Sequence, residues 1–170
     1  MSSADLLIDA YERIHESVRA ATEGLSMEQL HHRLDPEANT LAWLVWHLAR
    51  VQDDHVAGAF DSEQVWVAQG WAARFGLALE PGDIGYGHTA EEVARVRAPA
   101  ELLLDYYEAV HSNTLGHLRG LTDDDLNRVV DRSYEPPVTL AVRLVSVLSD
   151  DLQHVGQAAF LRGVLERLPA

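Results

Sequence analysis

The sequence contains no cysteine and no lysine. Without cysteine there can be no disulfide, no thiolate metal site and no cysteine nucleophile, and nothing about redox compartment can be inferred. All 13 basic residues are arginines, against 27 acidic residues, so the formal net charge is -14. Because a surface of that charge repels phosphate backbones, we expect no nucleic-acid partner.

Long apolar runs are missing as well. No stretch approaches the roughly 20 apolar residues that a membrane helix needs. The first residues, MSSADLLIDAYERIHESV, lack the basic flank and apolar stretch of a signal peptide. We therefore expect no membrane partner and a cytoplasmic location. A length of 170 residues with 47% apolar content suits a single domain spanning residues 1–170.

The alternation of apolar and polar residues that marks a strand is not convincing anywhere, whereas helical periodicity is strong. Residues 3–22 predict one long helix, and Thr40 can cap a second that runs to about residue 60. Pro99 can open a third helix through about Leu118, and a fourth is expected from about Leu140 to Leu168. Shorter helices are expected over residues 62–76 and 89–97, separated by a loop rich in glycine and proline. The sequence thus predicts an all-α four-helix bundle with extra short helices in the long central connection.

The last expected helix carries unusual polarity in the segment DDLQHVGQ, residues 150–157. His154 shares a helix face with four leucines and Val147, so its side chain should point inward. Asp150 precedes it by four residues and Asp151 by three, and either spacing places a carboxylate beside the imidazole. Spacing alone leaves the choice between the two aspartates open.

A histidine and a carboxylate on consecutive helical turns can bind one divalent ion, but a third ligand must come from elsewhere. The second long helix offers His47 and His55. Eight residues correspond to about 12 Å along a helix axis, so one ion cannot be bound by both. An internal repeat pairs TLAWLVWHLARVQDDHV (40–56) with TLAVRLVSVLSDDLQHV (139–155). This repeat aligns His55 with His154 and favours His55.

At these residues the chain resembles the DinB/YfiT-like superfamily. Its members are four-helix bundles, often dimers, with a histidine on the second helix and an H-x-x-x-H pair, commonly followed by G-Q, on the last long helix. The segment WHLA supplies His47, and DDLQHVGQAAFLRG supplies His154, Gly156 and Gln157. The chain departs from the pattern at the first histidine of the pair, which is Asp150. The related mycothiol-dependent maleylpyruvate isomerase has a carboxylate at that place and binds zinc.

The resemblance implies a site formed by His47, Asp150 and His154, with zinc or nickel as the metal. Among histidines of the second helix it therefore favours His47 over His55. Asp151, Gln157 and Arg143 are candidates for supporting the ligands or contacting substrate, since groups behind metal ligands usually orient them. Arg50 is a further candidate for meeting an anionic substrate, and Trp43, Trp46, Tyr106 and Tyr107 are candidates for walling a pocket. The six remaining histidines are expected to be solvated: His15, His31, His32, His88, His111 and His117.

Three protein ligands leave a coordination position for water or substrate, which is the catalytic arrangement of zinc. A metal there would lower the pKa of a bound water or thiol and polarise a carbonyl. By resemblance, we expect a metal-dependent transferase, isomerase or hydrolase that acts on a small molecule, with a low-molecular-weight thiol such as mycothiol as cosubstrate. The resemblance also implies a homodimer. The competing hypothesis is a non-catalytic dimeric bundle whose polar cluster is vestigial or structural.

Overall fold

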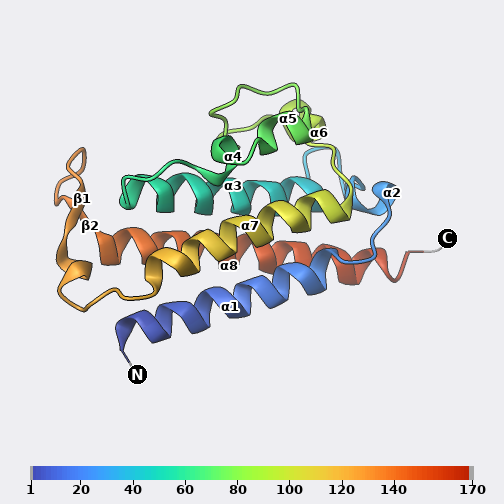
Figure 1. The fold of residues 1–170 in the computed structure, drawn as a ribbon. Coiled ribbons are helices and arrows are strands. Elements are labelled where there is room, and N and C mark those ends of the chain that lie inside the picture. Colours follow the sequence, from blue (N-terminus) through green and yellow to red (C-terminus); the bar gives the residue numbers. More distant parts are fainter. Residues whose placement is uncertain (1, 169–170) are drawn as a thin grey trace.

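The computed structural model describes residues 2–168, and four long helices form its frame (Figure 1). They are α1 (Ser3–Thr22), α3 (Leu41–Ala59), α7 (Ala100–Leu118) and α8 (Leu140–Leu165). The predicted all-α four-helix bundle is therefore confirmed. The last helix ends three residues before the expected Leu168.

α1 and α3 follow one another in the chain but lie diagonally across the bundle, and so do α7 and α8, whereas α3 and α7 are neighbours (Figure 1). α3 packs most extensively on α8, which runs antiparallel to it, and on α7, and α1 packs on the same two helices. α1 and α3 scarcely touch. The long crossover between α3 and α7 makes this arrangement possible. It also places α3 directly against the polar segment of α8.

Side-chain caps begin the two helices that carry the expected site. The Thr40 hydroxyl accepts a hydrogen bond from the Trp43 backbone N–H at 3.1 Å, and that of Thr139 accepts one from Val142 at 3.4 Å. Each cap satisfies one of the backbone donors that a helix start leaves unpaired. Both helices therefore begin where the sequence predicts.

α3 is buried on nearly every side along its first three turns. The other long helices cover part of it, and the central connection covers the rest with α4 (Val65–Ala68), α5 (Trp71–Phe75) and α6 (Ala90–Arg95). A helix buried all round needs apolar residues all round, which explains the sequence LAWLVWHLA. His47 lies in the middle of this apolar stretch and is 3% exposed.

Two predictions for the connecting segments need correction. The helix expected over residues 62–76 is split into α4 and α5 because Gly70 adopts a left-handed conformation, φ +70°. A short antiparallel hairpin, β1 (Val129–Asp131) and β2 (Val138–Thr139), precedes α8 where no strand was expected. These strands are too short to show alternation in the sequence. α2 (Met27–Leu30) and a 3-10 turn (Asp125–Asn127) complete the fold.

The outer face of α8 is apolar and exposed. Its side chains Val142, Val145, Leu152 and Phe160 are each more than half exposed. From Arg143 to Arg162 this face carries no formal charge among its exposed residues. Within residues 2–168, no helix is both long and apolar enough to cross a membrane.

Candidate metal centre

His47 of α3 meets Asp150 and His154 of α8 at the interface of the two helices. Each residue offers one ligand atom, and these atoms all lie within 4.8 Å of one another. The two imidazole rings stand edge to face with centroids 4.8 Å apart. The His154 Nε2 atom lies 3.8 Å from the Asp150 carboxylate. If the three ligand atoms moved slightly closer together, each could lie about 2.0–2.2 Å from a zinc ion placed between them.

Both histidines are oriented through their Nδ1 atoms. His47 Nδ1 donates to the carbonyl oxygen of Ile84, and His154 Nδ1 donates to Oε1 of Gln157 at 3.1 Å. In a neutral imidazole, a proton on Nδ1 leaves the lone pair on Nε2. Acceptors behind metal-binding histidines usually fix this tautomer. The arrangement therefore suits two Nε2 ligands and one carboxylate oxygen.

The electrostatic setting also fits a cation. Burial lowers the pKa of His47, and the hydrogen bond to Ile84 partly opposes this effect. The lowered pKa keeps the ring in the neutral form that binds metals. Oδ2 of Asp150 is buried without a hydrogen-bond partner among the described residues. A buried carboxylate oxygen that lacks a donor is costly unless a cation compensates it. The donor set is therefore consistent with a divalent metal.

The loop that leads into α6 is fastened over His47. The indole Nε1 of Trp43 donates to Nδ1 of His88 at 3.0 Å, so Nε2 of His88 carries the proton and donates to Asp83 at 2.8 Å. The other oxygen of Asp83 accepts from the Gly85 N–H at 2.8 Å. Trp43 stacks on the His47 ring at 4.5 Å. The loop thus holds the Ile84 carbonyl against His47.

Gly85 permits the close approach of this loop. Its φ is +97°, and a Cβ atom there would lie 2.6 Å from Nδ1 of His47 and 3.1 Å from Trp46. A side chain at this position would enter the space that the histidine ring occupies. The loop glycine is thus part of how His47 is positioned.

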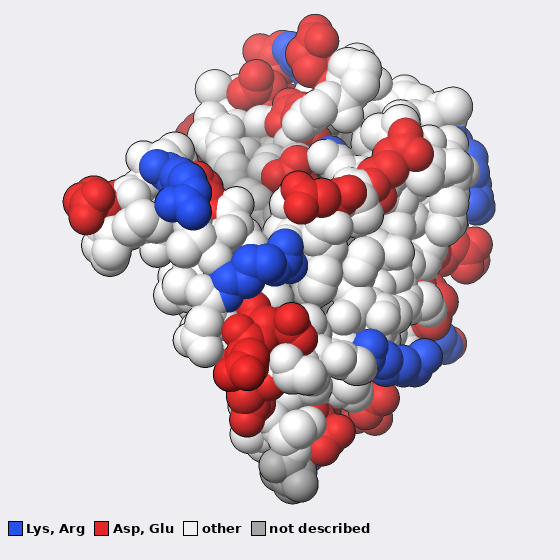
Figure 2. Space-filling model, turned by 60° about the vertical axis from the view of Figure 1, so that its left-hand side comes forward, with Lys and Arg blue, Asp and Glu red and all other residues white. Residues whose placement is uncertain are grey.

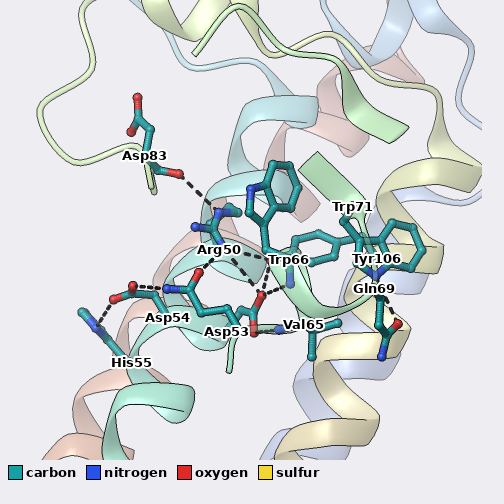
Figure 3. Close-up of polar contacts among 11 residues, drawn as sticks. Arg50, Asp53, Asp54, His55, Val65, Trp66, Gln69, Trp71, Asp83 and Tyr106 are labelled. Atoms are coloured by element: carbon teal, nitrogen blue, oxygen red, sulfur yellow. Dashed lines mark hydrogen bonds and ion pairs between the residues drawn. The ribbon is translucent and has the colours of Figure 1, made fainter. Parts of the chain in front are cut away.

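A buried polar network anchors the same loop from below (Figure 3). The Arg50 side chain is fully buried, and its Nε donates to the Asp83 carbonyl at 3.2 Å. Asp53 accepts from the Tyr106 hydroxyl and from the backbone N–H groups that begin α4, each at 2.8 Å. Burial raises the pKa of Asp53, and these hydrogen bonds partly oppose that effect. Arg50 is thus structural and is not accessible to an anionic substrate, contrary to the sequence-based expectation.

The three predicted supporting residues occupy different settings. Gln157 contacts the His154 ring as described. Asp151 points into the core, fully buried, with neither carboxylate oxygen hydrogen-bonded among the described residues. Arg143 pairs with Asp131 of β1 at 2.9 Å. Because it precedes Asp150 by seven residues, about 10 Å along the axis, it does not contact the three clustered side chains.

Asp151 does not orient any of the candidate ligands. Burial raises its pKa well above the ordinary value, and the charge of Asp150 adds to this effect. The pKa values of the Tyr11 and Tyr107 hydroxyls are raised mainly by their own burial and secondarily by the charge of Asp151. Tyr107 is fully buried and belongs to the hydrophobic core.

Tyr86 is a candidate functional residue that the sequence did not reveal. It lies between Gly85 and Gly87, both with positive φ, and is 60% exposed. Its ring stands edge-on to His47 at 5.5 Å and stacks near His55 at 6.3 Å. Burial raises its pKa, and the Asp150 charge contributes. The flanking glycines were the available signal, but they indicated no more than a loop.

Two of the histidines that were expected to be solvated are buried. His88 has both ring nitrogens engaged, and its side chain is 4% exposed. His111 is 6% exposed and stacks on His15 at 4.4 Å. His55 is not part of the cluster: it pairs with Asp54 at 3.1 Å.

Comparison with known proteins places the chain in a family. A model of the mycothiol-S-transferase family matches residues 6–167. The chain belongs to this family. It is a DinB/YfiT-like family, so the resemblance seen in the sequence is confirmed.

A solved structure of a conserved protein from Enterococcus faecalis is similar to this mycothiol-S-transferase family member throughout. The two are 31% identical, each is covered to 98%, and the TM-score is 0.89. The comparison with curated proteins finds no match. Membership of the mycothiol-S-transferase family indicates a mycothiol-related enzyme with a small-molecule thiol substrate.

Proposed function

We propose that this protein is a metal-dependent S-transferase that joins a low-molecular-weight thiol such as mycothiol to a small electrophile. The observation that carries the proposal is the convergence of His47, Asp150 and His154, with both Nδ1 atoms occupied by oxygen acceptors. The metal would be zinc, with nickel as the alternative, since imidazole and carboxylate ligands suit both. The family description supports the thiol.

Three protein ligands would leave a coordination position for the thiol. When bound, a divalent metal supplies a lowered thiol pKa and hence a thiolate near neutral pH. In the transfer, the thiol gives up its proton to water and its sulfur bonds to an electrophilic carbon. The leaving group departs with the electron pair of the bond that breaks.

The chain's own residues prepare this reaction. The Ile84 carbonyl and the stacked Trp43 ring hold His47 in one tautomer and one orientation. Gln157 does the same for His154. The Tyr86 hydroxyl belongs to an exposed side chain beside the centre and can donate a hydrogen bond to a bound substrate. The proposed reaction suits the cytoplasm, where thiols are kept reduced.

Metal content tests the site. Protein purified without an affinity tag should contain about one equivalent of zinc or nickel, and His154→Ala and His47→Ala should lose it. His55→Ala is the matched control, because it removes an imidazole from the same helix outside the cluster. Circular dichroism of each variant shows whether the bundle remains folded. A metal-free wild type that resists reconstitution would refute the proposed site and favour the non-catalytic bundle.

Turnover tests the reaction. The metal-loaded protein should consume mycothiol together with a fluorogenic electrophile and form the thioether, and His154→Ala should lose this activity. Product analysis distinguishes transfer from isomerisation and hydrolysis, because a transferase product contains both reactants. A metal-loaded protein that forms no thioether from mycothiol would contradict the transferase assignment.

A further inference from the structure

The helices α1 and α7 carry an internal repeat of their own, which the candidate metal centre does not use. Residues 9–15, DAYERIH, correspond to residues 105–111, DYYEAVH, at an offset of 96 positions. The aspartate, tyrosine, glutamate and histidine are identical in the two segments. Each helix therefore carries one Glu-x-x-His pair: Glu12 and His15 on α1, and Glu108 and His111 on α7.

The fold brings the two pairs together where α1 packs on α7, which runs antiparallel to it (Figure 1). The His15 and His111 rings stack with centroids 4.4 Å apart and planes 11° apart. Nε2 of His15 lies 2.7 Å from Oε2 of Glu108. The candidate metal centre lies between α3 and α8, so these residues occupy the opposite interface of the bundle.

The donor groups are those that helical bundles use to bind transition metals. Glu-x-x-His pairs on facing helices recur in such sites, because residues three apart lie on one face of a helix. His111 is 6% exposed, and its Nδ1 is buried without a hydrogen-bond partner among the described residues. Burial lowers the pKa of His111 to about 4, so at neutral pH the ring is in the uncharged form that binds metals. Two imidazoles and two carboxylates thus meet at one interface.

The four side chains must turn toward one another to enclose an ion. Within residues 2–168, the group at α3 and α8 is the one whose ligand atoms all lie within 4.8 Å of one another. Glu12 is exposed and the Glu108 side chain is 51% exposed, so both carboxylates have room to move. Ligand atoms at about 2.0–2.2 Å from a tetrahedral zinc ion lie about 3.3–3.6 Å apart, and His15 and Glu108 are already near that separation. Metal binding should therefore be weaker here than at the other interface.

The charge of the protein favours a cation at this place. There are 27 acidic residues against 13 arginines. On the face drawn in Figure 2, acidic side chains gather in groups while arginines stand singly. Arg13, which follows Glu12 in the chain, is paired with Asp9 at 2.7 Å. The two glutamates can therefore supply the negative charge that a divalent ion requires.

We propose that a second metal site, formed by Glu12, His15, Glu108 and His111, binds one divalent transition-metal ion such as zinc between α1 and α7. Two imidazole ligands favour such an ion over calcium or magnesium, which take oxygen ligands. Four protein ligands fill the coordination of a tetrahedral ion, which is the structural rather than the catalytic arrangement of zinc. The ion therefore fastens the N-terminal helix to α7. The site shares no ligand with the centre at α3 and α8, so it is independent of the proposed function.

Zinc titration of the full chain carrying His154→Ala tests the site, because this variant lacks a ligand of the other centre. Calorimetry should detect about one equivalent of zinc. Zinc at about 100 times its Kd should raise the melting temperature by about 5–10 °C, since an ion that binds only the folded chain stabilises it. In the wild type, added zinc should contribute one equivalent beyond the metal that survives purification.

Matched variants in the His154→Ala background locate the ion. Glu12→Gln, Glu108→Gln and His15→Ala should each weaken zinc binding about tenfold or more, as removal even of groups behind metal ligands does. Glu101→Gln makes the same change in net charge on an exposed residue of α7 and should leave the affinity unchanged. His117→Ala removes an imidazole from α7 outside the cluster and should also leave it unchanged. The two glutamine variants alter exposed side chains, so they should remain folded, which circular dichroism checks.

The outcomes separate this site from the candidate metal centre. A His154→Ala variant that binds no zinc would overturn the second site and show that His15 and Glu108 form a hydrogen-bonded pair only. Zinc binding that is unchanged in Glu12→Gln, Glu108→Gln or His15→Ala would also overturn it, because the ion would then lie elsewhere on the acidic surface. Zinc binding that these three variants weaken and the two controls do not would support the site, whatever metal the α3–α8 centre holds.

Discussion

Gly85→Ala tests how the loop positions His47. The added Cβ would lie 2.6 Å from the His47 Nδ1 atom, 3.1 Å from Trp46 and 3.2 Å from Trp43. Real Cβ atoms do not approach ring atoms so closely, so either the loop or the histidine must move. The neighbours are buried aromatic rings, and they have little room to yield. The loop is therefore expected to lift, which breaks the bond from His47 to the Ile84 carbonyl.

Two contributions set the size of the effect. An L side chain at φ +97° costs about 1–3 kcal/mol in backbone strain. Loss of the bond to Ile84 leaves a buried donor unpaired, which costs about 1–3 kcal/mol more. The free energy of unfolding of the metal-free protein should thus fall by about 2–6 kcal/mol, the sum of these two estimates. Metal affinity should fall about 10–100-fold, as when groups behind metal ligands are removed.

Gly87→Ala is the control. Gly87 has φ +71°, and an added Cβ would meet nothing within 4 Å. The free energy of unfolding of Gly87→Ala should therefore fall by about 1–2 kcal/mol through backbone strain alone, and the variant should keep its metal affinity. Urea unfolding of the metal-free proteins and metal competition titrations measure both quantities. If the two variants behave alike in both measurements, Gly85 does not position His47 and the reasoning is wrong.

Four further perturbations have defined outcomes. Asp151→Asn should raise the free energy of unfolding by at least about 1 kcal/mol at pH 7. The pKa of Asp151 is raised in the folded protein, so the carboxyl group destabilises the fold increasingly as pH rises above 3.8, and the amide removes this effect. Unchanged urea unfolding would contradict this prediction. Burial lowers the pKa of His111 from 6.5 to about 4. The free energy of unfolding should therefore decline by about 2 kcal/mol as pH falls from 6.5 to 4, after discounting for partial hydration. His111→Phe should flatten this decline in pH-dependent thermal unfolding. Asp53→Ala should cost about 3–5 kcal/mol in urea unfolding because it leaves Arg50 buried without its counter-charge; a loss below 1 kcal/mol, within the usual range for exposed sites, would argue against the network. We propose that the chain forms a homodimer through the exposed face of α8. Leu152→Asp should then convert the dimer to a monomer, which light scattering would measure, and a monomeric wild type would refute the proposal.

The fold could be predicted because local signals agree with the tertiary structure. Each long helix has helical periodicity, and capping residues such as Thr40 and Thr139 mark where two of them begin. The break at Gly70 escaped prediction because a single glycine is tolerated in helices as well as at their ends. The hairpin escaped it because strands of three and two residues carry no period.

The candidate site was only partly visible in the sequence. Spacing placed a carboxylate beside His154 but left Asp150 and Asp151 equivalent. The rotation of α8 within the bundle separates them: Asp151 shares the buried face with Val147 and Val155, whereas Asp150 lies at the edge that meets α3. That rotation depends on packing with the other helices, and no local pattern records it. The Tyr86 loop was hidden for the same reason, since its contact with His47 joins segments 37 or more residues apart.

The internal repeat favoured His55 as third ligand, and the antiparallel packing of α3 and α8 explains why the cluster contains His47 instead. The repeat has an offset of 99 positions, so it relates His55 to His154 and His47 to Ser146. Because the helices run in opposite directions, moving eight residues forward from His47 on α3 requires moving eight back from His154 on α8. That step leads to His55 facing Ser146, and both line a hollow of about 240 Å³ between α3 and α8. The pair related to His47 and His154 by the repeat is thus Ser146 and His55. One half of an approximately symmetric interface supplies the candidate metal ligands, and the other half places His55 and Ser146 in the wall of a hollow beside them.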